Sequence, residues 1–198
     1  MDLMPFALVA TAALVGSIPF GLILAKHFLN VDLQTMGSGN IGATNAARAG
    51  GKAFGAGVLV LDALKGFLGP WLASFYGLEP PWVAAAGLAA VLGHCYTPFL
   101  RFRGGKGVAT SLGVILAYDP ALGGIGVVAY ALVLAATRVS ALGSLSATVF
   151  SVGAAWFWPG EQFDLSIRLT LIAICVLIVW RHRSNLSALR QKKVDEKA

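Results

Sequence analysis

Long apolar runs separated by short polar breaks make up most of the 198 residues of this chain. A helix needs about 20 apolar residues to cross the hydrocarbon core of a membrane, so the pattern predicts an all-α integral membrane protein. We expect seven transmembrane helices; the fourth is short for an upright span, so it is tilted, partly sunk into the surface or paired with its neighbour. The expected spans are 3–25, 54–76, 82–98, 108–118, 120–137, 139–158 and 166–181.

Pairs of residues rich in proline and glycine mark the breaks between these runs. Neither a repeat nor a change in composition divides the chain, so we expect one transmembrane domain over residues 1–198. Hydrophobic residues make up 57% of the sequence and charged residues 12%, about half the charged fraction of a soluble protein, which argues against a soluble helical bundle. The clearest breaks are Gly50-Gly51, Pro80-Pro81, Asp119-Pro120 and Pro159-Gly160.

The basic residues fall on one side of the predicted membrane. With residue 1 outside, every Lys and Arg except Lys65 and Arg168 lies in a cytoplasmic segment. Because cytoplasmic loops are enriched in Lys and Arg, we expect the N-terminus outside, the C-terminus in the cytoplasm and cytoplasmic glycine-rich loops. The net charge of +6 then reflects a basic surface beside anionic headgroups, which predicts membrane lipids as partners and no nucleic acid. The cytoplasmic segments are 26–53, 99–107, residue 138 and the tail from residue 181.

Two polar, glycine-rich tracts interrupt the apolar pattern on this side, residues 37–45 and 103–111. Glycine lets successive main-chain N–H groups converge on an anion, and Arg48 and Lys106 add positive charge, so both tracts are predicted to hold phosphate. A third polar tract, residues 181–185, lies on the same side and can complete one site. Neither glycine-rich tract is a nucleotide-binding motif, since no strand precedes the G-x-G-x-x-G string of the first and the second lacks Walker spacing.

Glycine and charged residues also occur within the apolar runs. Close packing of helices accounts for Gly87, Gly113 and Gly126. Asp62 and Lys65 lie three residues apart on one helix face, and we expect them to form an internal ion pair that ties helices together. Charged groups at this depth also suit the alternative function, a membrane transporter of phosphate or phosphate esters.

Six short motifs are spread along the chain. They are Gly16-Ser17-Ile18-Pro19-Phe20-Gly21, the first tract continued through Arg48, Leu61-Asp62-Ala63-Leu64-Lys65-Gly66, Gly93-His94 with Pro98-Phe99-Leu100, the second tract through Thr110, and His182-Arg183-Ser184-Asn185-Leu186. Together they resemble the bacterial acyl-phosphate:glycerol-3-phosphate acyltransferase family over essentially the whole chain.

This resemblance implies a multi-pass enzyme of the bacterial cytoplasmic (inner) membrane with its active site facing the cytoplasm. Such an enzyme transfers a fatty acyl group from acyl phosphate to the 1-hydroxyl of sn-glycerol 3-phosphate and releases lysophosphatidic acid and inorganic phosphate. We expect acyl phosphate, glycerol 3-phosphate and membrane lipids as its partners, and we expect a monomer.

Two regions depart from the family pattern. Gln34 stands where the family has an Arg just before the first tract. Ala188 and the run Lys192-Lys193-Val194 occupy the region where the family has a basic residue followed by Gly-x-Glu. His182 and Asn185 are retained, so we expect activity, but the role of that glutamate has no counterpart in this chain.

The reaction needs two phosphate sites, alignment of the hydroxyl with the carbonyl, and stabilisation of a tetrahedral oxyanion. We predict catalytic roles for Arg48 and Lys106, which hold phosphate, for Ser38, which donates to the oxyanion, and for His182 and Asn185, which position glycerol 3-phosphate. We expect direct attack rather than a covalent step on Ser38, which would need His182 to activate it. The hydroxyl proton then goes either to His182 or to a phosphate oxygen of the substrate. Substrate-binding roles are predicted for Gly37, Gly39, Asn40, Gly42, Thr44, Asn45, Gly104, Gly105, Gly107, Thr110 and Ser111.

No metal and no cofactor are expected. Acyl phosphate is a mixed anhydride whose phosphate leaves as a stable anion, and the three tracts contain no acidic pair. Cys95 and Cys175 lie in apolar runs without a partner motif, so we expect neither a disulfide nor a zinc site. His94 is either a buried residue at a helix end or a support for the second tract.

Overall fold

The computed structural model describes residues 2–157 and 163–195, and within them it contains helices and no strands, as the sequence predicts. One short 3-10 helix, η1 (Pro98–Leu100), precedes α5. The α-helices are α1 (Met4–Ser17), α2 (Phe20–Leu29), α3 (Ala43–Phe75), α4 (Pro80–Cys95), α5 (Val108–Tyr118), α6 (Pro120–Thr137), α7 (Ser140–Phe157), α8 (Leu165–Arg181) and α9 (Arg183–Asp195).

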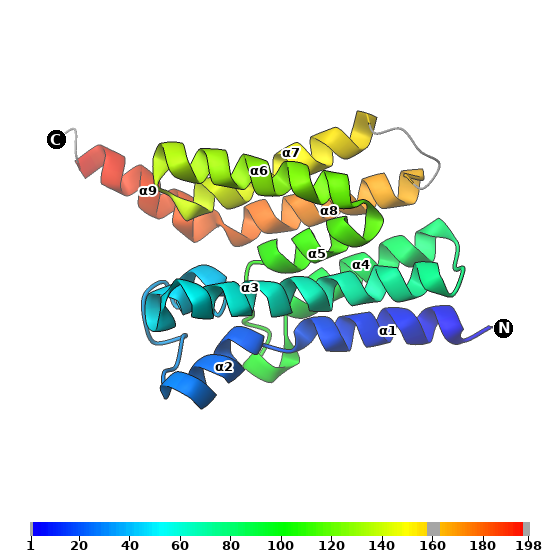
Figure 1. Ribbon diagram of the computed structural model, residues 1–198, viewed down its shortest axis with the longest axis horizontal. Coiled ribbons are helices and arrows are strands. Elements are labelled where there is room, and N and C mark those ends of the chain that lie inside the picture. Colours follow the sequence, from blue (N-terminus) through cyan, green and yellow to red (C-terminus); the bar gives the residue numbers. More distant parts are fainter. Residues whose placement is uncertain (1, 158–162, 196–198) are drawn as a thin grey trace.

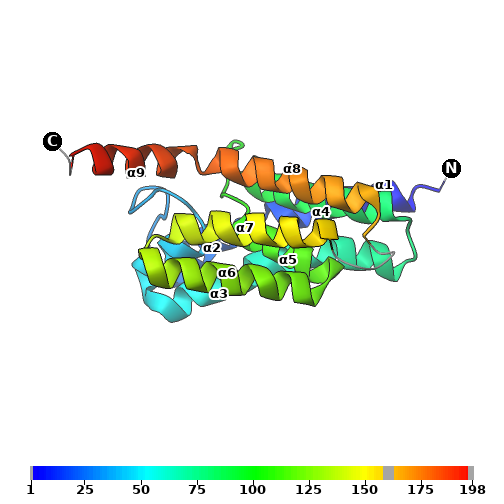
Figure 2. The ribbon, with the colours of Figure 1, turned by 90° about the horizontal axis from the view of Figure 1, so that it is seen from above.

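The helices form two groups with α5 between them (Figure 1). Helices α1, α3 and α4 lie on one side of α5, and α6, α7 and α8 lie on the other. The two ends of the chain lie at opposite ends of the bundle, and α9 extends beyond the other helices at the C-terminal end in both views (Figures 1 and 2). An outside N-terminus and a cytoplasmic C-terminus require this arrangement of the ends.

Five helical segments of the described chain are long and apolar enough to cross a membrane. Helix α8 joins α9 at a bend of 45°, and the two together would make a sixth. The remaining predicted span forms α5, which has only 11 residues and is short for a hydrocarbon core about 30 Å thick. The number of seven spans therefore stays a prediction. The five segments are Met4–Leu29, Ala43–Phe75, Pro80–Leu100, Pro120–Thr137 and Ser140–Phe157.

Two regions expected to be cytoplasmic loop or tail are helical. Helix α3 begins at Ala43 inside the first glycine-rich tract, 33 residues long, and its backbone leaves the helical conformation at Gly51, where φ is +84°. The predicted break at Gly50-Gly51 is thus a kink within α3. The turns before it carry polar side chains and are not part of an apolar run, so the apolar pattern did not predict them as helix. Helix α9 was missed for the same reason. The predicted break at Pro159-Gly160 lies outside the described residues.

Glycines allow close approach of the helices. A Cβ atom on Gly113 of α5 would lie 1.8 Å from the main-chain oxygen of Ala63 on α3, and one on Gly66 of α3 would lie 2.0 Å from that of Thr110 on α5. The two helices therefore meet backbone to backbone, as small residues allow in membrane proteins. The packing role predicted for Gly113 is confirmed.

The predicted ion pair within the membrane is also present. Lys65 Nζ lies 2.7 Å from Asp62 Oδ1, and both side chains are buried. Lys65 donates a second hydrogen bond, of 2.7 Å, to the main-chain oxygen of Ile18, where the chain breaks between α1 and α2. The same carbonyl also accepts from the N–H of Phe20 at 3.1 Å, so the buried ammonium of Lys65 ties α3 to the break between α1 and α2.

Candidate active site

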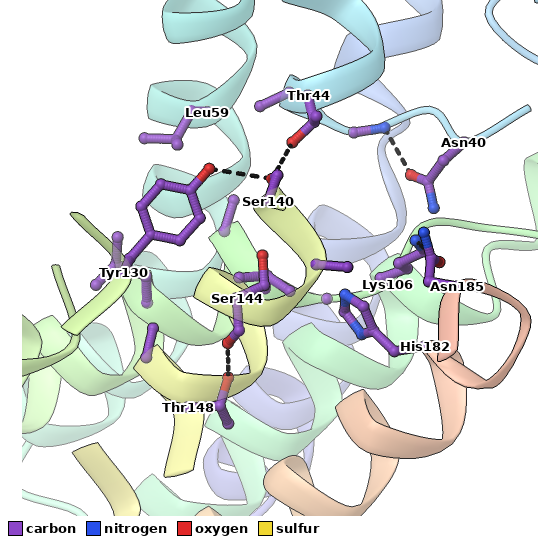
Figure 3. Close-up of a pocket in the computed structure, with 18 of the residues that line it drawn as sticks. Asn40, Thr44, Leu59, Lys106, Tyr130, Ser140, Ser144, Thr148, His182 and Asn185 are labelled. Carbon is purple, nitrogen blue, oxygen red and sulfur yellow. Dashed lines mark hydrogen bonds between the residues drawn. The ribbon is translucent and has the colours of Figure 1, made fainter. Parts of the chain in front are cut away.

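A cavity of about 600 Å³ lies where the three polar tracts meet. All of the predicted catalytic residues line it: Ser38, Arg48, Lys106, His182 and Asn185. In Figure 3 the side chains of Lys106, Asn185 and His182 lie together on one side of the cavity, facing those of Thr44, Ser140 and Tyr130. Residues more than 140 positions apart in the sequence therefore contribute to one site. The other predicted residues on its wall are Asn40, Gly42, Thr44, Asn45, Gly107 and Ser111.

The N-termini of two helices face this cavity. Gly42, Ala43 and Thr44 at the start of α3 line it, and so do Gly107 and Val108 at the start of α5. Gly42 and Gly107 are the N-cap residues, and neither helix has a hydrogen bond from a capping side chain. The first amides of a helix lack partners inside the helix and carry partial positive charge, so each start is suited to an anion.

The first tract is held in shape by Asn45. This side chain is 1% exposed and lies on the first turn of α3. Its Nδ2 donates to the main-chain oxygens of Leu33 at 3.0 Å and Met36 at 3.1 Å, and its Oδ1 accepts from the N–H of Ser38 at 3.1 Å. The N–H of Gly42 donates to Oδ1 of Asn40 at 2.8 Å. The amides of Ser38 and Gly42 are thus engaged within the protein.

The second tract is fixed by its neighbours in a similar way. The N–H groups of Gly104 and Gly105 donate to the main-chain oxygens of Cys95 and His94, both at 3.1 Å. The guanidinium of Arg181 donates to the carbonyl of Gly105 at 3.0 Å and to that of Gly104 at 2.7 Å. These bonds occupy the amides and carbonyls of Gly104 and Gly105, so they are not available to a ligand. The parts of the tract that line the cavity are Lys106 and the start of α5.

Five predicted substrate-binding residues do not belong to the cavity wall: Gly37, Gly39, Gly104, Gly105 and Thr110. Gly37 and Gly39 are exposed and have positive φ angles of +56° and +67°, so they shape the loop that carries Ser38. Gly105 packs against the buried ring of His94, since a Cβ atom there would lie 2.0 Å from Nε2. This contact gives His94 the supporting position that the sequence left open.

Lys106 connects the second and third tracts. Its ammonium donates a hydrogen bond to Oδ1 of Asn185, near the start of α9. Burial, followed by the positive charges of Arg181 and Arg48, lowers the pKa of Lys106. The clustering of like charges leaves the site electropositive and suited to an anionic ligand.

His182 is buried at the junction of α8 and α9, with 2% of its surface exposed. Its Nδ1 lies 2.8 Å from the main-chain oxygen of Ile178. A carbonyl can only accept, so Nδ1 carries the hydrogen and Nε2 of the neutral ring keeps a free lone pair. Burial lowers the pKa of His182, with a further contribution from the charge of Lys106, although the bond to Ile178 acts in the opposite direction. The ring is therefore held neutral, as a hydrogen-bond acceptor on the cavity wall.

The sequence missed the residues that close the other side of the cavity. Ser140 Oγ lies 3.1 Å from Thr44 Oγ1 and 3.1 Å from Tyr130 OH, so three hydroxyls join α3, α6 and α7 (Figure 3). Asp62 and His94 also reach the wall. Tyr130 and Ser140 lie in predicted spans, outside the three polar tracts and the family motifs, so nothing in the sequence marked them as site residues. Asp62 and His94 belong to family motifs, which did mark them.

The described residues contain no cluster of side chains that could bind a metal ion. Within these ranges no group of three or more His, Cys, Asp and Glu side chains is placed to hold a metal ion. Cys95 and Cys175 are both free thiols. The polar side chains on the cavity wall are mostly hydroxyls, amides and cations, which are suited to an anion.

Similar proteins share one description. A family model described as glycerol-3-phosphate acyltransferase matches residues 6–192. Proteins named glycerol-3-phosphate acyltransferase include one from Methylobacillus flagellatus, 42% identical over 91% of this chain and 91% of its own length. Another, from Myxococcus xanthus, is 45% identical over 96% of this chain and 97% of its own length.

Two solved structures are also similar, both of PlsY (YgiH), described as an integral membrane glycerol 3-phosphate acyltransferase. The glycerol 3-phosphate form superposes with a TM-score of 0.89 at 38% identity and covers 96% of this chain and 93% of that one. The lysophosphatidic acid form has a TM-score of 0.87 at 37% identity with the same coverage.

Proposed function

The chain belongs to the glycerol-3-phosphate acyltransferase family and is a membrane acyltransferase, and on this premise we propose that it transfers a fatty acyl group from acyl phosphate to the 1-hydroxyl of sn-glycerol 3-phosphate. The products are lysophosphatidic acid and inorganic phosphate. The glycerol 3-phosphate and lysophosphatidic acid forms of the similar structures support the acceptor and the product.

The observation that carries the choice of donor is the pair of helix N-termini on one cavity wall. The starts of α3 and α5 each suit one anion, and Arg48 and Lys106 supply charge beside them. Glycerol 3-phosphate fills one of these sites. The second site then calls for a donor that also carries phosphate at its reacting end, and acyl phosphate does so.

The cavity also offers the acyl chain a place. Beyond the helix starts it continues between α5, α6 and α7, along the apolar side chains of Leu112 and Ile115. Its rim includes Leu59 of α3 and Val127 of α6, which are 41% and 50% exposed on the outer surface of the bundle. An amphiphilic donor can therefore enter sideways from the lipid with its phosphate at the polar end.

The reaction follows from the positions of the polar groups. The glycerol 1-hydroxyl oxygen attacks the acyl carbonyl carbon, the new C–O bond forms, and the bond from carbon to the phosphate oxygen breaks. Nε2 of His182 accepts a hydrogen bond from the hydroxyl and orients it, with Asn185 beside it. Lys106, Arg48 and the helix starts stabilise the charge that passes to the departing phosphate. The hydroxyl proton goes to His182 or to a phosphate oxygen of the substrate.

We also propose that the polar end of the cavity faces the cytoplasm, because most Lys and Arg residues belong to the segments at that end. The site needs a single copy of the chain, since all five predicted catalytic residues come from one cavity wall. Thiol labelling of Cys introduced at exposed Arg101 and at exposed Glu79 in sealed spheroplasts tests the orientation. Reaction of the Arg101→Cys variant with an impermeant reagent from outside would reverse it.

The function is tested with purified protein in detergent, without a membrane gradient. Palmitoyl phosphate and labelled glycerol 3-phosphate should give lysophosphatidic acid and inorganic phosphate in equal amounts, and the rate should be unchanged by a chelator. Palmitoyl coenzyme A with glycerol 3-phosphate is the donor control, and palmitoyl phosphate with glycerol is the acceptor control. Product from the thioester and none from acyl phosphate would overturn the proposed donor.

A further inference from the structure

The part of the cavity between α5, α6 and α7, which we call the deep limb, has one wall of small side chains. Ser140, Ser144, Ala147, Thr148 and Ser151 lie on one face of α7 and all line the cavity. At a rise of 1.5 Å per residue, this wall is about 16 Å long from Ser140 to Ser151. The deep limb exists because these side chains are small.

The two deeper hydroxyl groups of the wall, those of Thr148 and Ser151, are engaged with the backbone. Thr148 Oγ1 donates to the main-chain oxygen of Ser144 at 3.0 Å, and Ser151 Oγ donates to that of Leu122 at 3.1 Å. A hydroxyl that bonds to its own helix or to the next one presents its carbon atoms to the space in front of it. With Leu112 across the limb, the lining is suited to a hydrocarbon chain.

The far end of the deep limb is closed by a contact between α6 and α7. A Cβ atom on Gly126 would lie 2.5 Å from Oγ of Ser151, so the two helices touch there. Behind this contact lie Leu122 and Ala155, which are 0% and 1% exposed and belong to a buried apolar cluster with Ile115. Ile115, Gly126 and Ser151 thus form a packed floor.

We propose that the deep limb is a ruler that sets the longest acyl chain the enzyme uses efficiently, with Ile115, Gly126 and Ser151 as its end. The proposal rests on the proposed function, which supplies the acyl chain as occupant. The limb is about as long as half of a hydrocarbon core of about 30 Å, which is the length of one lipid chain in a leaflet.

Selectivity in such a site comes from shape. The donor arrives from lipid, so moving its chain into an apolar limb changes little water-exposed surface and adds little affinity. A chain too long for the limb must distort a packed interior, and we expect it to lose at least about tenfold in kcat/KM, or about 1.4 kcal/mol.

The test places leucine at three depths on α7. Ser151→Leu, Ala147→Leu and Ser144→Leu are compared by kcat/KM for lauroyl, myristoyl, palmitoyl and stearoyl phosphate. The longest chain used well should become shorter in that order, because each filled position lies about one turn closer to the phosphate end. Gly153→Leu is the matched control on the same helix, since Gly153 is exposed and no atom lies within 4 Å of a Cβ built there. It should leave the chain-length profile as in the wild type.

A variant that lengthens the deep limb distinguishes a shorter limb from a misfolded protein, because it should improve the use of long chains. Ile115→Ala removes part of the floor and should raise the rate with stearoyl phosphate relative to lauroyl phosphate. An unchanged profile in both Ser151→Leu and Ala147→Leu would overturn the ruler and indicate that the chain leaves between Leu59 and Val127. An equal loss for all chain lengths in every filling variant, with no gain in Ile115→Ala, would overturn it too. Failure of the proposed function is a separate result, since the wild type would then not convert palmitoyl phosphate.

Discussion

The side-chain oxygen of Asn45 accepts a hydrogen bond from the main-chain N–H of Ser38 at 3.1 Å, while its nitrogen donates to the carbonyls of Leu33 and Met36. One buried amide on α3 thus holds the loop of the first tract at three points. Asn45 is a positioning residue for Ser38, and the conformation of the tract depends on it.

Asn45→Asp should damage this arrangement with almost no change in size. The carboxylate has no donor for the two carbonyls, and each lost partner of a buried group costs about 1–3 kcal/mol. We expect a lower Tm and a fall of kcat/KM by about a hundredfold, with Ser38 displaced. Asn30→Asp at the exposed end of α2 is the control. Wild-type Tm and kcat/KM in Asn45→Asp would contradict the role assigned to the amide.

Much of the fold could be predicted because apolar runs and their breaks are local signals. The bounds of α5 and α6 agree with the expected 108–118 and 120–137, since Gly107 and Pro120 mark their starts. The first turns of α3 and the whole of α9 could not be found in this way, because they carry polar side chains and are not apolar runs.

Which residues meet in the cavity was largely predictable, but their hydrogen bonds were not. Glycine composition suggested that tract amides would cradle phosphate, yet the amides of Gly104 and Gly105 bond to α4. Which amides remain free depends on tertiary contacts between distant segments, and these have no local signal. The deep limb was not predicted for a similar reason, since the sequence pattern around Ser144 and Thr148 is that of small residues in a packed helix.

The pH dependence should reflect two lowered pKa values. Burial lowers the pKa of His182 below its usual 6.5. The ring therefore stays neutral, and kcat/KM stays level, until the pH falls through this lowered pKa. The pKa of Lys106 is also lowered, so phosphate binding weakens as the pH rises through a value below 10.5. In His182→Gln the acid limb should disappear; an acid limb that persists belongs to a phosphate group of a substrate. Lys106→Arg should move the alkaline limb to higher pH.

Lys106 and Asn185 should behave as a coupled pair. Lys106→Met removes a positive charge from the phosphate end and leaves Asn185 Oδ1 without its donor. A hydrogen bond to a charged group contributes about 1.5–3 kcal/mol, so KM for glycerol 3-phosphate should rise by about tenfold to a hundredfold. Asn185→Leu should raise the same KM, and the double variant should show less than the product of the two effects. Lys52→Met, at an exposed position of α3, is the charge-matched control. Independent effects in the double variant would show that the pair is not coupled.

Substrate binding should depend on the planar guanidinium of Arg181, which can bond two carbonyls at once, and not only on its positive charge. Its guanidinium bonds the carbonyls of Gly104 and Gly105 and stacks 5.3 Å from the ring centre of Tyr96. Arg181→Lys keeps the charge but cannot bond both carbonyls in the same plane, so KM for glycerol 3-phosphate and for the acyl donor should rise while kcat changes less. Arg183→Lys, at an exposed position two residues away, should leave both KM values as in the wild type. Equal KM values in the two variants would assign the effect to charge alone.

Contact between α3 and α5 leaves no room for a side chain at Gly113. A Cβ atom there would lie 1.8 Å from the oxygen of Ala63 and 2.9 Å from the nitrogen of Phe67, both in the backbone, so Gly113→Ala must push the helices apart. Overpacking of this kind costs about 1–3 kcal/mol, and because α5 begins at the active site we expect both a lower Tm and a lower kcat. Gly57→Ala is the matched control on α3, where no atom lies within 4 Å of the added carbon and alanine favours the helix by about 1 kcal/mol over glycine. Thermal unfolding in detergent should therefore shift in opposite directions for the two variants, and a Gly113→Ala protein as stable as Gly57→Ala would show that α3 and α5 do not meet through their backbones.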